Sequence, residues 1–123
     1  MKKRTRRQER ESPESRIAAT RLDAARLEAL IEVATVDCYN ESEELTGIFT
    51  MLEENLALPF TTTVLGMEVS VERVELNEAG EIVAMCRRGR RRQSVPILDL
   101  PLPVRRPSGA EWIEVYKRWG RRR

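Results

Sequence analysis

"FTTTVLGMEVSVERVELNEAGEIVAMCRRGRRRQSVPILDL" (residues 60–100) is the stretch that decides the fold class. Threonine and valine are dense in it, and Val69 and Val71 alternate with polar residues at the period of two that is typical of a half-buried strand. Turn residues interrupt this pattern at Gly66, at "NEAG" (77–80) and at "RRGR" (87–90). We therefore predict four strands, near residues 60–65, 67–76, 81–87 and 92–97.

Strands that are joined this tightly predict a small antiparallel barrel of the SH3-like kind, because curling the sheet leaves fewer open edges in a small domain. Helical patterns flank the stretch on both sides. The predicted fold class is therefore α+β, with an N-terminal helical hairpin packed on a small SH3-like antiparallel β-barrel and a helix at the C-terminus.

The first helix of the hairpin is expected to begin at Pro13, with Ser12 as its N-cap, or one turn later. Its apolar residues form a loose stripe near the 3.6-residue period, and the strong helix formers alanine and leucine are frequent in it. We expect this helix to run to about Tyr39.

The second helix is predicted from Glu41 to about Ala57. Asn40 fits its N-cap, and Glu43 stands three residues later, where it could accept in return from the backbone of Asn40. Pro59 disfavours a helical conformation at the residue before it and turns the chain into the strands.

The last helix is predicted in "SGAEWIEVYKRW" (108–119), with Ser108 as its cap. Its apolar side chains recur at spacings that place them on one face, and they are Trp112, Val115, Tyr116 and Trp119. Such a stripe is more often a face that docks a helix on the core than a platform on which nucleic-acid bases stack.

The length of 123 residues, with 41% hydrophobic content, indicates one domain with a modest core. We predict a single α+β calcium-binding domain at residues 16–120, preceded by a basic flexible segment at residues 1–15 and followed by a basic tail at residues 121–123.

No segment approaches the roughly 20 apolar residues of a membrane span, so a cytoplasmic protein without membrane contact is expected. Cys38 and Cys86 are isolated and are expected to be reduced.

Charge is segregated along the chain. Residues 1–21 carry eight basic and three acidic side chains, residues 22–86 carry two basic and fourteen acidic ones, and residues 87–123 carry twelve basic and three acidic ones. A segment with such an acidic excess repels itself unless it folds against the basic flanks or binds cations.

No catalytic constellation is visible. The chain contains no histidine, so a serine or cysteine nucleophile would lack its usual base, and the glycine-rich phosphate-binding motifs are absent. Paired carboxylates are abundant, but none is singled out by its context. We therefore expect a protein that is not an enzyme.

The stretch "VDCYNESEELTGIFTMLEEN" (36–55) holds six carboxylates and no lysine or arginine. Calcium binds six to eight oxygens from carboxylates, amide or backbone carbonyls and water. Four side chains around the turn between the two helices could converge on one such ion, and they are Asp37, Asn40, Glu41 and Glu44. The alternative is that the glutamates merely offset the positive end of the helix dipole, at about 0.3 to 1 kcal/mol each.

An EF-hand is excluded. A loop that started at Asp37 would place Ser42 where glycine makes the sharp turn and Ile48 where a bidentate glutamate closes the site. Any calcium site in this chain is of another type.

Three segments carry a family resemblance. The D-x-Y-N-E-x-E-E turn at residues 37–44, the L-x-x-P-F junction at residues 56–60 and the W-x-x-x-Y-x-x-W helix at residues 112–119 resemble the CcbP-like family of bacterial non-EF-hand calcium-binding proteins. The resemblance covers about residues 30–119. It implies a helical hairpin joined to an SH3-like barrel, calcium as the bound ion, and a role as an intracellular calcium buffer or sensor. The basic ends of this chain depart from the acidic composition of that family.

The arginine-rich segment "RRGRRR" (87–92) supports a competing hypothesis. Placed at a hairpin tip, and together with the basic termini, it could neutralise several phosphates, as expected of a small β-barrel protein that binds nucleic acid. No aromatic residues are interleaved with these charges, so a stacking groove for single strands is not supported. The simpler alternative is that these arginines pair with the acidic helices across the fold.

Overall fold

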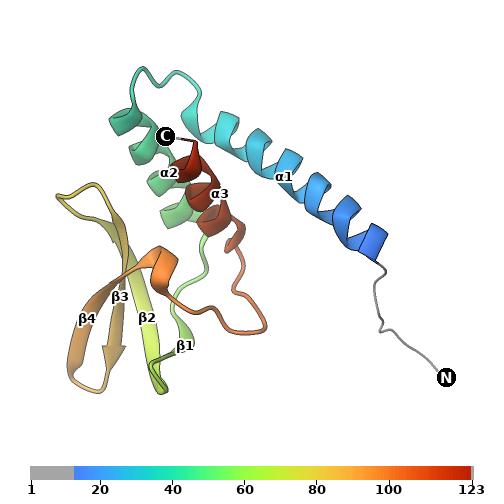
Figure 1. Cartoon of the computed structure of the whole chain (residues 1–123). Coiled ribbons are helices and arrows are strands. Elements are labelled where there is room, and N and C mark those ends of the chain that lie inside the picture. Colours follow the sequence, from blue (N-terminus) through green and yellow to red (C-terminus); the bar gives the residue numbers. More distant parts are fainter. Residues whose placement is uncertain (1–12, 123) are drawn as a thin grey trace.

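The computed structural model describes residues 13–122, with side chains from residue 24 onward. Within this part the chain forms α1 (Pro13–Thr35), α2 (Glu41–Asn55), β1 (Phe60–Val64), β2 (Met67–Leu76), β3 (Ile82–Arg88), β4 (Arg91–Pro96), the short 3-10 helix η2 (Ile97–Asp99) and α3 (Glu111–Arg121). The predicted cap at Ser12, most of the predicted flexible segment and Arg123 lie outside the described residues. Figure 1 shows the helices on one side of the sheet.

The four strands form one antiparallel sheet in the order β1-β2-β3-β4, so each strand pairs with its neighbour in sequence. All four predicted strands are confirmed, with ends that differ by at most one residue. One irregularity, between Val71 and Arg73 of β2, shifts the register against β3. The α+β class and the antiparallel sheet are therefore as predicted.

The predicted closure of this sheet into an SH3-like barrel is not confirmed. β1 and β4 remain the two edges of an open sheet among the described strands. The reason lies in how the apolar face is covered. α2 packs against β2, and α1, α2 and α3 pack on one another, so a layer of helices buries the face that a barrel would have buried by closing.

One hydrophobic core joins the helices to the sheet. Ile48 and Leu52 of α2 are completely buried, as is Val71 of β2. The aromatic stripe of α3 docks on this core as predicted, since Trp112 and Trp119 are almost fully buried and Val115 is completely buried. Burial of side chains of this size is worth roughly 1.5–3 kcal/mol each relative to exposure.

The segment between η2 and α3 returns the chain from the sheet to the helices. The Thr62 hydroxyl donates to the carbonyl of Pro101, which holds this segment on β1. The Ala57 N–H then donates to the carbonyl of Ser108 at 2.8 Å, just beyond the end of α2. α3 begins at Glu111 with Ala110 at its N-cap and no side-chain cap, so the predicted cap at Ser108 is wrong.

Gly109 lies where this return segment meets α2. Its φ is +87°, a backbone conformation that residues with a side chain rarely adopt. A Cβ atom at this position would lie 2.0 Å from the carbonyl oxygen of Asn55. The close approach of the two backbones therefore requires glycine.

No helix in residues 13–122 is long and apolar enough to cross a membrane. Both cysteines are free thiols, as predicted, with Cys86 buried in the sheet and Cys38 half-buried beside the turn between α1 and α2.

Candidate functional site

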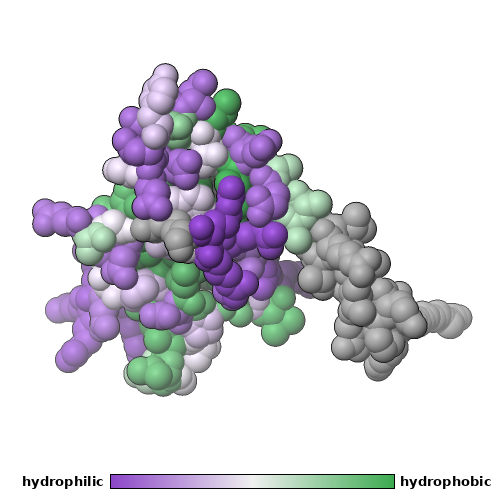
Figure 2. Space-filling model, turned by 45° about the horizontal axis from the view of Figure 1, so that its top comes forward, coloured by the Kyte–Doolittle hydropathy of each residue, from purple (hydrophilic) through white to green (hydrophobic). Residues whose placement is uncertain are grey.

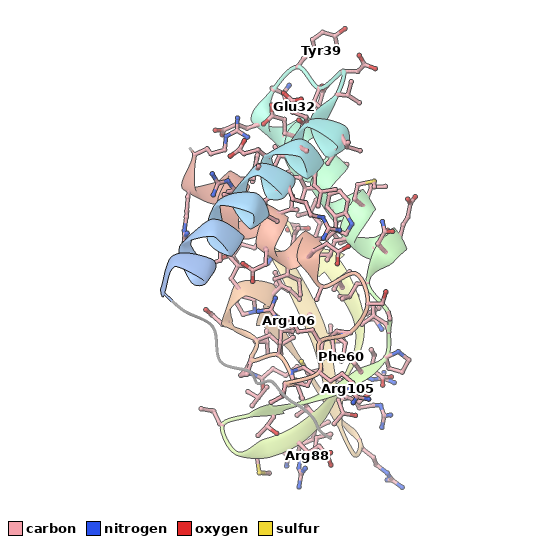
Figure 3. The ribbon with its side chains drawn as sticks, turned by 90° about the vertical axis from the view of Figure 1, so that its right-hand side faces the viewer. Glu32, Tyr39, Phe60, Arg88, Arg105 and Arg106 are labelled. Atoms are coloured by element: carbon pink, nitrogen blue, oxygen red, sulfur yellow. The ribbon has the colours of Figure 1, made fainter. Side chains whose placement is uncertain are left out.

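The turn between α1 and α2 places the four predicted calcium ligands at one end of the molecule. α1 ends at Thr35, four residues before the predicted end, and Asp37 adopts a left-handed conformation with φ +67°. This reversal lets the chain enter α2 at Asn40, which is extended. In Figure 3, Tyr39 marks this turn at the end of the molecule opposite to Arg88.

Asn40 is the N-cap of α2, as predicted. Its Oδ1 atom accepts from the Glu43 backbone N–H at 2.8 Å. The reciprocal bond differs from the prediction, because Oε1 of Glu43 accepts from the N–H of Tyr39 at 2.7 Å rather than from that of Asn40. These two bonds fix the first turn of the helix and explain part of the acidic motif without a metal ion.

Glu44 points away from the turn toward α3. Its Oε1 atom accepts a hydrogen bond from Nε1 of Trp119 at 2.8 Å. The indole is almost fully buried, so this carboxylate satisfies the single polar group of a core side chain. Glu41 and Asp37 are exposed at the turn.

Negative charge nevertheless gathers at the turn. The pKa of the Cys38 thiol is raised, first by burial and then by the charges of nearby carboxylates, which are Glu43, Glu44 and Asp37. The negative charges of these three carboxylates therefore all lie near the Cys38 thiol, beside the turn between α1 and α2. Glu43 was predicted only as a capping residue, and its contribution to this charge follows from its place in the first turn of α2.

The described residues contain no group of three or more histidine, cysteine, aspartate or glutamate side chains that could hold a metal ion. Asp37, Asn40, Glu41 and Glu44 thus share one end of the molecule without forming a preassembled cage. Asn40 and Glu44 each make a structural hydrogen bond, although an amide oxygen and a carboxylate each keep further lone pairs.

The arginine-rich segment forms the tip of the β3–β4 hairpin. Arg87 pairs with Glu72 of β2 at 3.4 Å, and Nη1 of Arg88 donates to the backbone carbonyl of Glu68. In the part of the chain that the structure describes, Arg88, Arg90, Arg91 and Arg92 form no ion pair. The predicted pairing of this segment with the acidic helices is therefore wrong.

C-terminal arginines pair with the acidic helices instead. Nε of Arg118 lies 2.7 Å from Oε2 of Glu28 on α1, and Nη1 of Arg122 lies 3.5 Å from Oε1 of the same residue. The pKa of Glu28 is accordingly lowered, chiefly by its hydrogen bond with Arg118. This pairing joins the C-terminal end of α3 to α1.

A groove of about 430 Å³ opens on the sheet beside the hairpin tips. We call it the basic groove. Apolar side chains of all four strands line it together with three arginines. The apolar lining includes Val64, Met67, Val69 and Val95, and the arginines are Arg88, Arg91 and Arg92. Figure 2 shows apolar atoms beside hydrophilic ones at the lower end of the molecule, where the hairpin tips lie in Figure 1.

Comparison with known proteins gives no relative: no family model, no curated protein and no solved structure matches this chain.

Proposed function

We propose that the protein is not an enzyme and that it binds calcium ions through the acidic turn between α1 and α2. The observation that carries the proposal is the gathering of Asp37 and the first-turn glutamates of α2 at one turn, in a stretch of twenty residues that contains no lysine or arginine. A hard cation with oxygen ligands is the counterion that such a site favours. The resemblance of residues 37–44 to the CcbP-like family supports the same ion.

Asp37, Asn40, Glu41 and Glu44 are the proposed ligands, with water completing the coordination. Because two of these side chains already accept hydrogen bonds, ligand binding requires them to share or exchange partners. Such reorganisation weakens binding, so we expect dissociation constants of about 10⁻⁴ to 10⁻³ M, the range of weak calcium modules.

Calorimetric titration with calcium, with magnesium as the competitor, tests the proposal. We expect heat of binding at millimolar calcium that magnesium reduces only at a large excess, since magnesium gives up its water reluctantly. No heat beyond that of dilution would contradict calcium binding.

A double substitution identifies the ligands. Asp37→Asn with Glu41→Gln should weaken calcium binding about tenfold or more, which corresponds to about 1.4 kcal/mol. The same change should leave the stability of the calcium-free protein unchanged or slightly higher, because it removes like charges that repel one another. Titration and thermal unfolding measure the two effects.

The matched control removes two charges from the last turn of the same helix, by Glu53→Gln with Glu54→Gln. This control should retain nearly all of the calcium affinity. If instead the Asp37→Asn and Glu41→Gln variant loses about 1 kcal/mol of stability and keeps its calcium affinity, the carboxylates serve the helix dipole alone.

Nucleic-acid binding is the second candidate, favoured by four hairpin arginines that form no ion pair within the described residues, Arg88, Arg90, Arg91 and Arg92. Changing Arg88, Arg90 and Arg91 to serine should reduce affinity for a generic duplex and lower the slope of its salt dependence by up to about three. Calcium affinity should stay the same or rise slightly, because distant positive charge is removed. A parent protein that fails to bind duplex at about 50 mM salt would exclude this candidate.

A further inference from the structure

The basic groove continues the core-facing side of the sheet beyond the helices. Val69 and Val71 lie two residues apart on β2, so they face the same side. Val71 is completely buried under the helical layer, whereas Val69, nearer the hairpin tips, is only partly buried and lines the groove. The groove is therefore core-like surface that the helices leave open within the described part of the chain.

The arginines at the rim of the groove favour a partner with negative charge. Arg88 and Arg91, which both line the groove, face each other across β3 and β4. Like charges directly opposite on a sheet repel one another, so an acidic partner would relieve this repulsion. The floor is aliphatic and has no aromatic ring, which suits a partner that brings apolar side chains better than it suits a phosphodiester backbone.

The opposite end of the molecule has the complementary character. Tyr39 is 90% exposed and Val36 is 67% exposed, so both offer apolar surface to a partner. Asp37 and Glu41 flank them. We call these four residues the acidic tip. Figure 3 places Tyr39 and Arg88 at opposite ends, so one copy cannot fold its own tip into its own groove.

We propose that the acidic tip of one copy docks in the basic groove of a second copy. Tyr39 and Val36 would then cover the aliphatic floor, and the carboxylates would face the arginines. An exposed tyrosine that enters a groove is a common anchor of protein interfaces. Because the two surfaces differ, the contact is heterologous, and it repeats from copy to copy into a chain unless the rotation closes a ring.

Two variants separate the two surfaces. The tip variant, Val36→Ser with Tyr39→Ser, keeps all four proposed calcium ligands. The groove variant, Arg91→Glu with Arg92→Glu, replaces like-charged cross-strand pairs by opposite charges with Arg88 and Arg87, so the hairpin is not put at risk. Neither variant tests calcium binding, so the failure of this inference and of the proposed function can be told apart.

Sedimentation velocity of the full chain gives the result. We expect the mass of the parent protein to rise beyond that of a dimer as concentration increases at low salt, and to fall toward that of a monomer at about 0.5 M salt. Each variant alone should remain a monomer. An equimolar mixture of the two variants should form a dimer that grows no further, because only one complementary tip and groove remain intact.

A control variant with the same charge change, Lys117→Glu with Arg121→Glu on α3, should associate like the parent. The inference is overturned if the parent is a monomer at about 1 mM and low salt, if the mixture stays monomeric, or if either variant associates like the parent. Association that requires added duplex would assign the groove to nucleic acid and would overturn it equally.

Discussion

Substitution of Gly109 by alanine is expected to destabilise the fold by about 3 kcal/mol or more, which would lower the melting temperature by roughly 10 °C. Two effects combine at this position. The left-handed φ of +87° is strained for any residue with a Cβ atom. In addition, the new Cβ atom would lie 2.0 Å from the Asn55 carbonyl oxygen, and this contact is with backbone that cannot rotate away. Thermal unfolding followed by circular dichroism measures the loss.

Gly66→Ala separates the two effects. Gly66 has a similar φ of +77° in the β1–β2 turn, but no atom lies within 4 Å of the position of its Cβ. This control should cost only about 1–2 kcal/mol, the strain alone. Equal losses for the two variants would show that the return segment does not dock on the end of α2.

Gly47→Ala should also destabilise the fold, by about 1–3 kcal/mol, although alanine is normally the better residue inside a helix. Gly47 lies in α2 where this helix meets α1. A Cβ atom there would lie 2.3 Å from the backbone oxygen of Ala34, so the two helices would have to move apart. Chemical denaturation gives the change in the free energy of unfolding.

The matched control is Gly120→Ala in α3, where nothing lies within 4 Å of the new atom. That variant should gain roughly 0.5–1 kcal/mol from helix propensity alone. The same substitution in two helices is thus expected to have opposite signs. A gain in stability at Gly47 would contradict the close contact between α1 and α2.

Local signals were sufficient to predict most of the secondary structure. The alternation of Val69 and Val71 and the turn residues around Gly66 and Gly89 depend on neighbours in sequence, so they located the strands. The cap at Asn40 is equally local. Features that depend on distant parts of the chain were missed, including the open edges of the sheet, which follow from the packing of α2 on β2 and of the three helices on one another.

The candidate site remains a prediction, and only the position of its residues can be compared with the sequence. The sequence indicated an acidic turn and an arginine-rich hairpin tip, and the structure places them at opposite ends. The sequence could not indicate that Glu44 accepts a hydrogen bond from Trp119, 75 residues later. Nor could it indicate that Glu28 forms ion pairs with the C-terminal arginines. Long side chains pair with groups that lie near them in the fold, and the spacing of residues along the chain does not reveal which groups those are.

The open sheet has a consequence for aggregation. An exposed edge strand offers unpaired backbone groups to any other chain that presents an edge. The edge at β4 carries Arg91 and Arg92, so two copies that approached edge to edge would bring four positive charges together. The other edge, β1, has no charged residue, but the segment around Pro101 is bonded to it through Thr62. The sheet is thereby protected against fibril-like growth by electrostatic repulsion at one edge and by the return segment at the other.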